Sequence, residues 1–247
     1  MKIGIITQPL HNNYGGLLQN YALQQVLKRM GHEPITLRSG TALLSYSKWN
    51  YLAHFSLWYV KYYIYKYLGY KIDRPITQKQ YSYDSAGMNA FVTRNIICTR
   101  PLLKHQSEEL LELNIDALIV GSDQVWRPSY NTDIMYFQFL GFAKGLDLIR
   151  ISYAASFGTN KWEFTKRETL EAGRLLQKFD AVSVREESAV TMCKEHFGVD
   201  ATWVLDPTML LNIDDYLSLC KDVAPVVDKY IFAYILDEDG NKRTSPS

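Results

Sequence analysis

The stretch that decides the fold runs from Lys2 to Met30 and reads "KIGIITQPLHNNYGGLLQNYALQQVLKRM". Lys2–Thr7 is a short apolar run, which predicts a buried strand. Leu17–Met30 carries apolar residues at positions 17, 18, 22, 23, 26, 27 and 30, the spacing of a helix that buries one face. A polar and glycine-rich connector, Asn12–Gly16, separates the two. This order predicts the first unit of an α/β fold.

The same alternation continues along the chain. Gly31 is the predicted end of the first helix, and Pro34–Arg38 is predicted as the second strand. Further strands are expected at Asp116–Gly121, Ile149–Ala155, Asp180–Arg185 and Ala201–Asp206, with helices at Phe164–Phe179 and Glu187–Phe197. Strands that alternate with helices predict a Rossmann-like α/β fold with a doubly wound, mostly parallel sheet.

Composition excludes several classes of protein. The chain has 247 residues, 47% of them hydrophobic and 21% charged, which is typical of a soluble globular protein with a full core. The formal net charge of +1 gives no reason to expect a nucleic-acid partner. Neither CxxC nor HExxH spacing occurs, so no metal site is predicted.

The cysteines and the N-terminus bear on the compartment. Cys98, Cys193 and Cys220 are few, distant and odd in number, which favours a reducing environment over a disulfide framework. The first residues read as a short strand and not as the longer apolar core of a signal peptide. We therefore expect a cytoplasmic protein.

Tyr46–Tyr70, "YSKWNYLAHFSLWYVKYYIYKYLGY", is crowded with aromatic residues and has helical spacing. Three interpretations are open: a helical cap that packs on the sheet, a platform whose rings stack on sugars, and a helix that lies on the inner face of a membrane. We place this stretch in a helical, aromatic-rich insertion at residues 41–95.

Lys229–Leu236, "KYIFAYIL", predicts another buried strand close to the end of the sequence. Either it completes the first sheet or it begins a second domain. The domain boundaries we expect are 1–225 for a Rossmann-like domain and 226–247 for the start of a C-terminal domain.

Four polar clusters follow predicted strands, and ligands of open parallel sheets bind outside the carboxyl ends of the strands. The first is Asn12–Gly16, where Gly15 and Gly16 allow close backbone approach before a helix N-terminus that can bind an anion. It matches neither GxGxxG nor GxxxxGK[ST], and the alternative is a simple turn with Asn13 capping the helix.

The second cluster, Gly121–Arg127, offers hydrogen-bonding groups and a guanidinium to a hydroxylated, partly anionic ligand. Alternatively, Ser122 or Asp123 caps a turn and Trp126 fills the core.

The third cluster, Ser152–Gly158, has small residues that permit close approach of a ligand. The fourth consists of Arg185 with Glu186, and Asp206 with Pro207; here the alternatives are a local ion pair and a turn cap.

These clusters carry a specific resemblance. The segments "NNYGGLLQNYALQ", "ALIVGSDQVWRP", "ISYAASFG", "AVSVREESAV" and "VLDPTMLL" occur in the order and approximate spacing of the polysaccharide pyruvyl transferase family. The resemblance runs from residue 1 to about 236. The combined order of the five segments is more specific to this family than any one segment.

The resemblance implies a two-domain fold similar to GT-B glycosyltransferases, of which this chain looks like the N-terminal half. It implies transfer of the enolpyruvyl group of phosphoenolpyruvate to a sugar of a surface polysaccharide or its lipid-linked precursor. Phosphoenolpyruvate would be a donor substrate, and no cofactor is expected. The substrate-binding residues expected at the matched positions are Asn12, Asn13, Tyr14, Gly15, Gly16, Gln19, Ser122, Asp123, Gln124, Trp126, Arg127, Ser156, Arg185 and Asp206.

Roles follow from the same resemblance. Arg127 and Arg185 would clamp anions, Gly15 and Gly16 would present backbone donors, and Asp123 would hold an acceptor hydroxyl. Trp126 and the aromatic residues of 46–70 would stack on sugar rings.

The catalytic acid is not assigned. Members of the family typically carry an Asp-Ser-Phe-His-Gly-like motif in the C-terminal half, and none of the five histidines lies in such a motif. We therefore expect a truncated form that needs a missing C-terminal half or a partner chain. Two other functions stay open: a sugar-nucleotide-dependent glycosyltransferase of similar fold, and a non-catalytic subunit that binds or assembles glycans.

Overall fold

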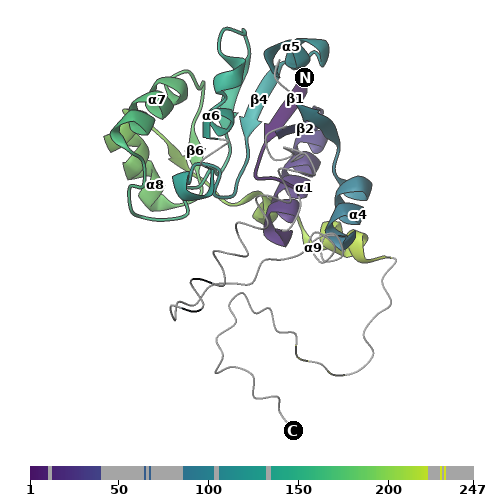
Figure 1. Ribbon diagram of the computed structural model, residues 1–247. Helices are drawn as coiled ribbons and strands as arrows, with labels where there is room; N and C mark the ends of the chain where they lie inside the picture. Colours follow the sequence, from purple (N-terminus) through teal and green to yellow (C-terminus); the bar gives the residue numbers. More distant parts are fainter. Residues whose placement is uncertain are drawn as a thin grey trace. The chain divides into compact units, whose positions relative to one another are not determined.

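The computed structural model describes residues 1–10, 13–39, 64, 67, 86–102, 106–131, 135–221, 229 and 231 (Figure 1). Two compact units are present, Met1–Leu211 and Asn212–Ser247. Apart from single positions, the aromatic stretch 46–70 and the predicted strand 229–236 lie outside the described residues, as does Asn12. The expected domain boundaries and the GT-B-like second half stay predictions.

The first unit is built on a parallel sheet. Its five strands, β1 (Lys2–Ile6), β2 (Glu33–Ser39), β3 (Cys98–Leu102), β4 (Ala117–Val120) and β5 (Ile149–Ser152), lie in the order β3-β2-β1-β4-β5. All four pairings between neighbours are parallel. This confirms the predicted Rossmann-like α/β fold.

Two short strands extend the arrangement beyond β5. β6 (Ser183–Val184) pairs in parallel with β7 (Thr202–Trp203). Isolated parallel bridges join Ile151 to Ala181 and Ala155 to Val184, which places β6 beside β5. The strand ends that carry the third and fourth polar clusters therefore lie along the same edge as those of β1 and β4.

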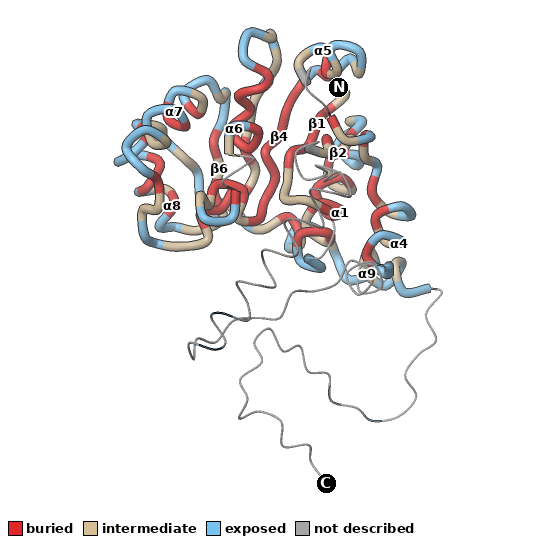
Figure 2. Tube along the Cα trace, in the orientation of Figure 1, coloured by how far each residue is buried: buried red, intermediate tan, exposed pale blue. Residues whose placement is uncertain are grey.

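Side chains of the central strands alternate between two cores. Ile3 and Ile5 of β1 pack with Leu23 and Leu27 of α1 (Tyr14–Arg29) on one face. Ile6, on the other face, belongs to the larger cluster. Burial on both faces is the usual environment of parallel strands, and Figure 2 shows β1 and β4 buried between the helices.

Helices cover the sheet between the strands. They are α4 (Ala86–Asn95), α5 (Gln106–Glu112), α6 (Met135–Gln138), α7 (Lys166–Leu176) and α8 (Glu187–Met192), which continues as the π-helical turn η4 (Cys193–Phe197). Short 3₁₀ turns are η2 (Pro128–Tyr130), η3 (Gly141–Ala143) and η5 (Pro207–Leu210). The second unit contains α9 (Ile213–Leu217), capped by Asn212, and η6 (Ser218–Cys220).

The first helix begins earlier than the sequence predicts. It starts at Tyr14 and not at Leu17, because the Asn13 side chain accepts a hydrogen bond from the backbone N–H of Gly16 and caps it. Gly15 and Gly16 thus form the first helical turn and are not part of a loop. The predicted stop is confirmed, since Gly31 follows the helix with a φ of +82°.

Other boundaries also differ. β6 and β7 have two residues each and are shorter than the strands predicted at Asp180–Arg185 and Ala201–Asp206. The strand predicted at Ile149–Ala155 ends at Ser152. Ala154 has a left-handed backbone, with a φ of +54°, which ends regular pairing there. The edge strand β3 was not predicted; its Pro101 is a residue that sheets tolerate mainly at their edges.

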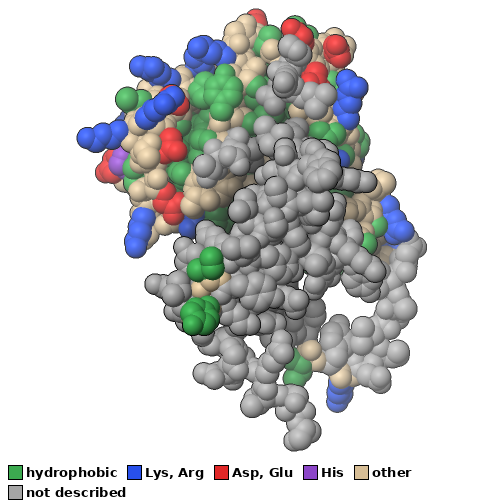
Figure 3. Space-filling view, viewed as in Figure 1, with side chains coloured by type: hydrophobic (Ala, Val, Ile, Leu, Met, Phe, Trp, Pro, Cys, Tyr) green, Lys and Arg blue, Asp and Glu red, His purple; other side chains and the backbone are tan. Residues whose placement is uncertain are grey.

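Positively and negatively charged side chains are mixed on the visible face of the molecule (Figure 3). Figure 3 shows Lys and Arg side chains near α7 and α8 interspersed with Asp and Glu. This mixture on the visible face agrees with the balanced net charge of the sequence.

Candidate functional site

The chain order of the sheet creates a switch point between β1 and β4. The chain proceeds from β1 outward through β2 to β3 and then returns to β4 on the other side of β1. Connections leave the carboxyl ends of β1 and β4 in opposite directions there, and ligands of such folds typically bind outside the strand ends at a switch point. Asn13 follows β1, and Asp123 follows β4.

A hydrogen bond joins the segments that follow β1 and β4. The Asn13 Nδ2 donates to Asp123 Oδ2 at 3.0 Å, while Asn13 Oδ1 accepts from the Gly16 N–H at 3.2 Å. Asn13 therefore both caps α1 and fixes the carboxylate that follows β4. Glycine at position 16 suits the same contact, because a Cβ there would lie 3.1 Å from Asp123 Oδ2 and the carboxylate would have to shift slightly.

Asp123 is held in an unusual backbone conformation. Its φ is +84°, which non-glycine residues seldom adopt and which aspartate and asparagine tolerate best. Its residue exposure is 9%. The Oδ1 atom accepts from the Gln124 N–H at 2.8 Å, and the Asp123 carbonyl accepts from the Ser156 N–H at 3.1 Å. The loops after β4 and β5 are thereby joined.

Burial raises the pKa of the Asp123 carboxyl above its ordinary value. The hydrogen bond from Gln124 and the positive charge of Arg185 act in the opposite direction, and the negative charge of Asp206 adds to the increase. Burial also raises the pKa of the neighbouring Tyr153 hydroxyl, and Asp206 again contributes. The environment of Asp123 therefore favours proton uptake.

Arg185 organises the neighbouring strand ends. Its guanidinium contacts Glu186 Oε1 at 3.1 Å, Asp206 Oδ2 at 3.3 Å and Ser156 Oγ at 3.3 Å. Burial disfavours the charged guanidinium, but the hydrogen bonds and charges of Glu186 and Asp206 outweigh it and raise the pKa of Arg185. Arg185 is therefore a fixed cation within a ring of acceptors.

Ser156 and Gln19 complete this ring. The Ser156 hydroxyl donates to Glu186 Oε1 at 2.7 Å. Gln19, one turn into α1, donates from Nε2 to Asp206 Oδ2 at 2.6 Å. Asp206 Oδ1 caps η5 by accepting from the Thr208 N–H at 3.0 Å. Loops that follow five strands are thus joined in one network.

We call this network the strand-end cluster. Its members are Asn13, Gly16, Gln19, Asp123, Ser156, Arg185, Glu186 and Asp206. The ion pair and the turn cap expected as alternatives for Arg185 and Asp206 are both present, yet they join these residues to the other loops. All of these residues were named from the sequence, but Glu186 was not among the predicted site residues. Its position beside Arg185 was the available signal.

Arg127 and Gln124 lie in a second, adjoining set of contacts. Arg127 donates to Gln124 Oε1 at 2.9 Å, pairs with Glu163 at 3.4 Å and lies over the Tyr130 ring. The Gln124 carbonyl accepts from Gln8 Nε2 at 2.8 Å, which links the loops after β1 and β4 again. Hydrogen bonding by Ser129, together with Arg127, lowers the pKa of the Glu163 carboxyl.

Trp126 belongs to the core. Its residue exposure is 0%, and its ring stacks on Phe139 with centroids 5.3 Å apart. The indole therefore presents no open face to a sugar, and the geometry favours the alternative that Trp126 fills the core. Tyr14 differs, because it is 57% exposed at the start of α1.

Several buried polar atoms of this region lack a partner within the part of the chain that the structure describes. They include Gln19 Oε1, Ser122 Oγ and Glu186 Oε2. Buried polar atoms are normally hydrogen-bonded, and these three atoms are both unpartnered and shielded from solvent, so they mark unused hydrogen-bonding capacity and not an open binding position.

Comparison with protein families decides the affiliation of this chain. The model of polysaccharide pyruvyl transferases matches residues 13–244. The chain belongs to the polysaccharide pyruvyl transferase family. The matched range includes every member of the strand-end cluster, and family membership identifies the protein as a transferase enzyme. A search of individual curated proteins finds no match.

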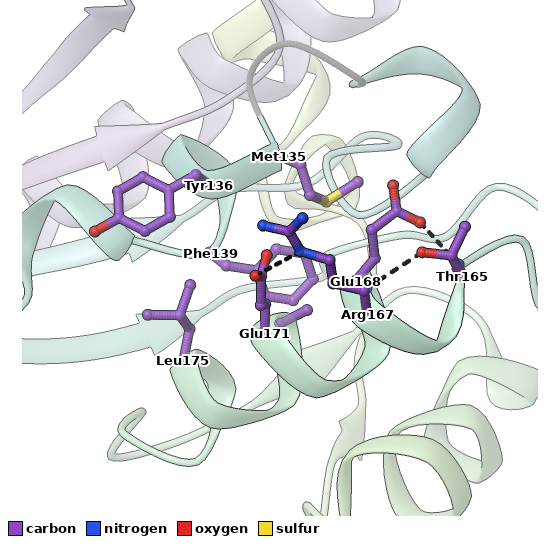
Figure 4. Close-up of a pocket in the computed structure, with 9 residues that line it drawn as sticks. Met135, Tyr136, Phe139, Thr165, Arg167, Glu168, Glu171 and Leu175 are labelled. Atoms are coloured by element: carbon purple, nitrogen blue, oxygen red, sulfur yellow. Dashed lines mark hydrogen bonds and ion pairs between the residues drawn. The ribbon is translucent and has the colours of Figure 1, made fainter.

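Two hollows of this pyruvyl transferase family member lie away from the cluster. One, of about 390 Å³, lies between α6 and α7 (Figure 4). Its Arg167 pairs with Glu171, and its Glu168 completes the cap of α7 with Thr165, so these polar groups are already used. The other, of about 440 Å³, is lined by Trp162 and His196, whose rings stack 3.8 Å apart.

Over the described ranges, no group of acidic, histidine or cysteine side chains has the arrangement of a metal site. Within the same ranges, no helix has both the length and the apolar character needed to cross a bilayer.

Proposed function

We propose that the protein transfers the enolpyruvyl group of phosphoenolpyruvate to a sugar diol of a surface polysaccharide or its lipid-linked precursor. The product is a pyruvate ketal, and inorganic phosphate is released. Phosphoenolpyruvate serves as a substrate, and the proposed reaction uses no separate cofactor. The observation that carries the proposal is the Asn13–Asp123 hydrogen bond across the switch point of a chain matched to this family.

The strand-end cluster suits the acceptor sugar. Three carboxylates, those of Asp123, Glu186 and Asp206, surround the single guanidinium of Arg185. An excess of acceptor oxygens favours hydroxyl groups, which donate hydrogen bonds, and disfavours the anionic carboxylate and phosphate of the donor. We therefore propose that the cluster binds acceptor hydroxyls.

This proposal modifies the expected role of the arginines. Arg185 was expected to clamp an anion, but two carboxylates of the chain already contact it. Arg127 likewise pairs with Glu163, although that pair is partly exposed and exchangeable. We propose Arg127 as the cation that can turn toward the donor, and Arg185 as the group that orders the acceptor site.

The donor can be tested directly. Purified protein is incubated with phosphoenolpyruvate and a panel of aryl hexosides with free vicinal or 4,6-diols, and inorganic phosphate is followed by ³¹P NMR. Parallel samples contain a nucleotide sugar in place of phosphoenolpyruvate. Acceptor-dependent release of phosphate supports the proposal, whereas consumption of the nucleotide sugar alone would replace it with glycosyl transfer.

A further inference from the structure

We propose that Asp123 is the general base that removes the proton from the attacking hydroxyl of the acceptor sugar. This inference rests on the proposed function and assigns one catalytic residue within it. The carboxylate lies at the carboxyl end of β4, where the strand order reverses. No other carboxylate of the strand-end cluster combines this position with free acceptor capacity.

The three carboxylates differ in how their oxygens are used. Asp206 accepts from Gln19 and Arg185 through Oδ2 and caps η5 through Oδ1. Glu186 accepts from Arg185 and Ser156 through Oε1, while its Oε2 is shielded from solvent. Both are direct ion-pair partners of Arg185, which stabilises their charged forms and weakens them as bases.

The hydrogen bonds that the structure describes for the Asp123 carboxylate come only from neutral donors, and the charge of Arg185 acts on it without a direct contact. Asn13 Nδ2 donates to one oxygen, and the Gln124 N–H donates to the other. A carboxylate offers about four lone-pair positions, so each oxygen keeps capacity for a substrate hydroxyl. The two donors fix the plane of the carboxylate without neutralising it, which is the preorganisation that a general base needs.

The backbone at Asp123 holds the carboxylate in place, although its left-handed conformation is unfavourable for a residue other than glycine. Asp123 combines a left-handed φ with burial, and Gly16 leaves the space that its Oδ2 atom occupies. Burial also raises the pKa of the Asp123 carboxyl, which makes the carboxylate a stronger base.

The chemical step balances with the substrates named. The hydroxyl oxygen of the sugar forms a bond to C2 of phosphoenolpyruvate, and its proton passes to Asp123. The electrons of the C2–C3 double bond take up a proton at C3 from a general acid. In the second step, the other hydroxyl bonds to C2, the C2–O bond to phosphate breaks, and the proton of that hydroxyl leaves with the phosphate. The proton held by Asp123 then returns through solvent to the general acid, which restores both groups.

The test compares Asp123→Asn with wild type in the phosphate-release reaction. Asparagine has nearly the same shape and tolerates a positive φ, so the variant is expected to fold. The matched control is Asp116→Asn, which lies before β4 at the opposite edge, where Asp116 Oδ2 accepts from the Lys2 N–H at 2.7 Å. Circular dichroism and thermal melting verify the fold of each protein.

For Asp123→Asn we expect kcat to fall about 10²- to 10⁴-fold, with KM for phosphoenolpyruvate changed less than about threefold. In wild type, kcat/KM for the acceptor rises with pH as the base ionises, and this acidic limb disappears in the variant. Asp116→Asn should behave like wild type. A purely structural role would not remove one limb of the pH profile.

The possible failures are distinguishable. If wild type releases phosphate and folded Asp123→Asn retains its rate and its acidic limb, the assignment of Asp123 is overturned and the proposed function stands. If wild type releases no phosphate with any acceptor of the panel, the proposed function fails, and the assignment fails with it.

Discussion

Asn13 and Asp123 are separated by 110 residues in the sequence, yet the Asn13 amide donates a 3.0 Å hydrogen bond to the Asp123 carboxylate. One residue follows β1 and the other follows β4, so the bond closes the switch point of the sheet. It also ties the cap of the first helix to the proposed catalytic base. Stability of the fold and geometry of the site are therefore coupled at a single side chain.

Replacing Asn13 should cost more than the loss of an ordinary helix cap. Asn13→Ala removes the cap of α1, which contributes about 0.5–2 kcal/mol. It also removes a donor from the buried Asp123 carboxylate, a further loss of about 1 kcal/mol. The matched control is Thr165→Ala, which removes the cap of α7 without touching the cluster. Urea denaturation compares the free energies of unfolding, and equal losses would contradict the coupling.

Gly16→Ala should fail to stabilise the first helix. Alanine in place of glycine normally favours a helix by up to about 1 kcal/mol. At this position the added Cβ would meet Asp123 Oδ2 at 3.1 Å and Asn13 Nδ2 at 3.3 Å, so the carboxylate must move. We expect reduced activity and no gain in stability.

The control for that substitution is Gly87→Ala in α4. An added Cβ there has nothing within 4 Å, so a gain of about 0.5 kcal/mol in the free energy of unfolding is expected. A Gly16→Ala protein that is both more stable and fully active would show that the glycine is not needed for the carboxylate.

The pH dependence of stability should reveal the environment of Asp123. Its pKa is raised in the folded protein above the 3.8 of the unfolded chain, so ionisation costs more in the folded state. Wild type should therefore lose stability relative to Asp123→Asn as the pH rises from about 3.8 through the folded pKa, and the difference should then level off. Chemical denaturation at successive pH values measures this. Parallel curves for the two proteins would contradict the raised pKa.

Trp126 should act as a core residue. Trp126→Ala is expected to lower the free energy of unfolding by about 3–5 kcal/mol, because a fully buried ring that packs on Phe139 is removed. Trp126→Phe keeps most of the apolar volume and should retain both KM for the acceptor and kcat within about threefold. A large rise in the acceptor KM of folded Trp126→Phe would instead support sugar stacking.

Sequence patterns predicted the parallel sheet because buried strands such as Ala117–Val120 are continuous apolar runs that periodicity detects. They also placed the polar clusters, since carboxyl ends of parallel strands meet at one edge. They did not reveal that Trp126 points into the core, because an indole after a strand suits either environment. Nor did they predict β3, whose "CTRPL" lacks an apolar pattern and is specified by pairing with β2.

Glu186 shows a second limit of the sequence. Acidic residues at a helix start are favourable in any protein, so its presence before α8 gave no specific signal. Its contacts with Ser156 and Arg185 depend on tertiary structure that brings the ends of β5 and β6 together. The polar residues at the strand ends were therefore predictable from the sequence. Which of the three carboxylates pair directly with Arg185 could be seen only in the structure.

The central claim is that substrates bind at the switch point between β1 and β4. The most direct measurement is a ¹H–¹⁵N spectrum of the backbone and side-chain amides during titration with phosphoenolpyruvate and an aryl hexoside. We predict that the Asn13 amide shifts, while the amide of Asn212, which caps α9 in the second unit, does not. An unchanged Asn13 amide, with shifts confined to the hollow between α6 and α7, would contradict the account.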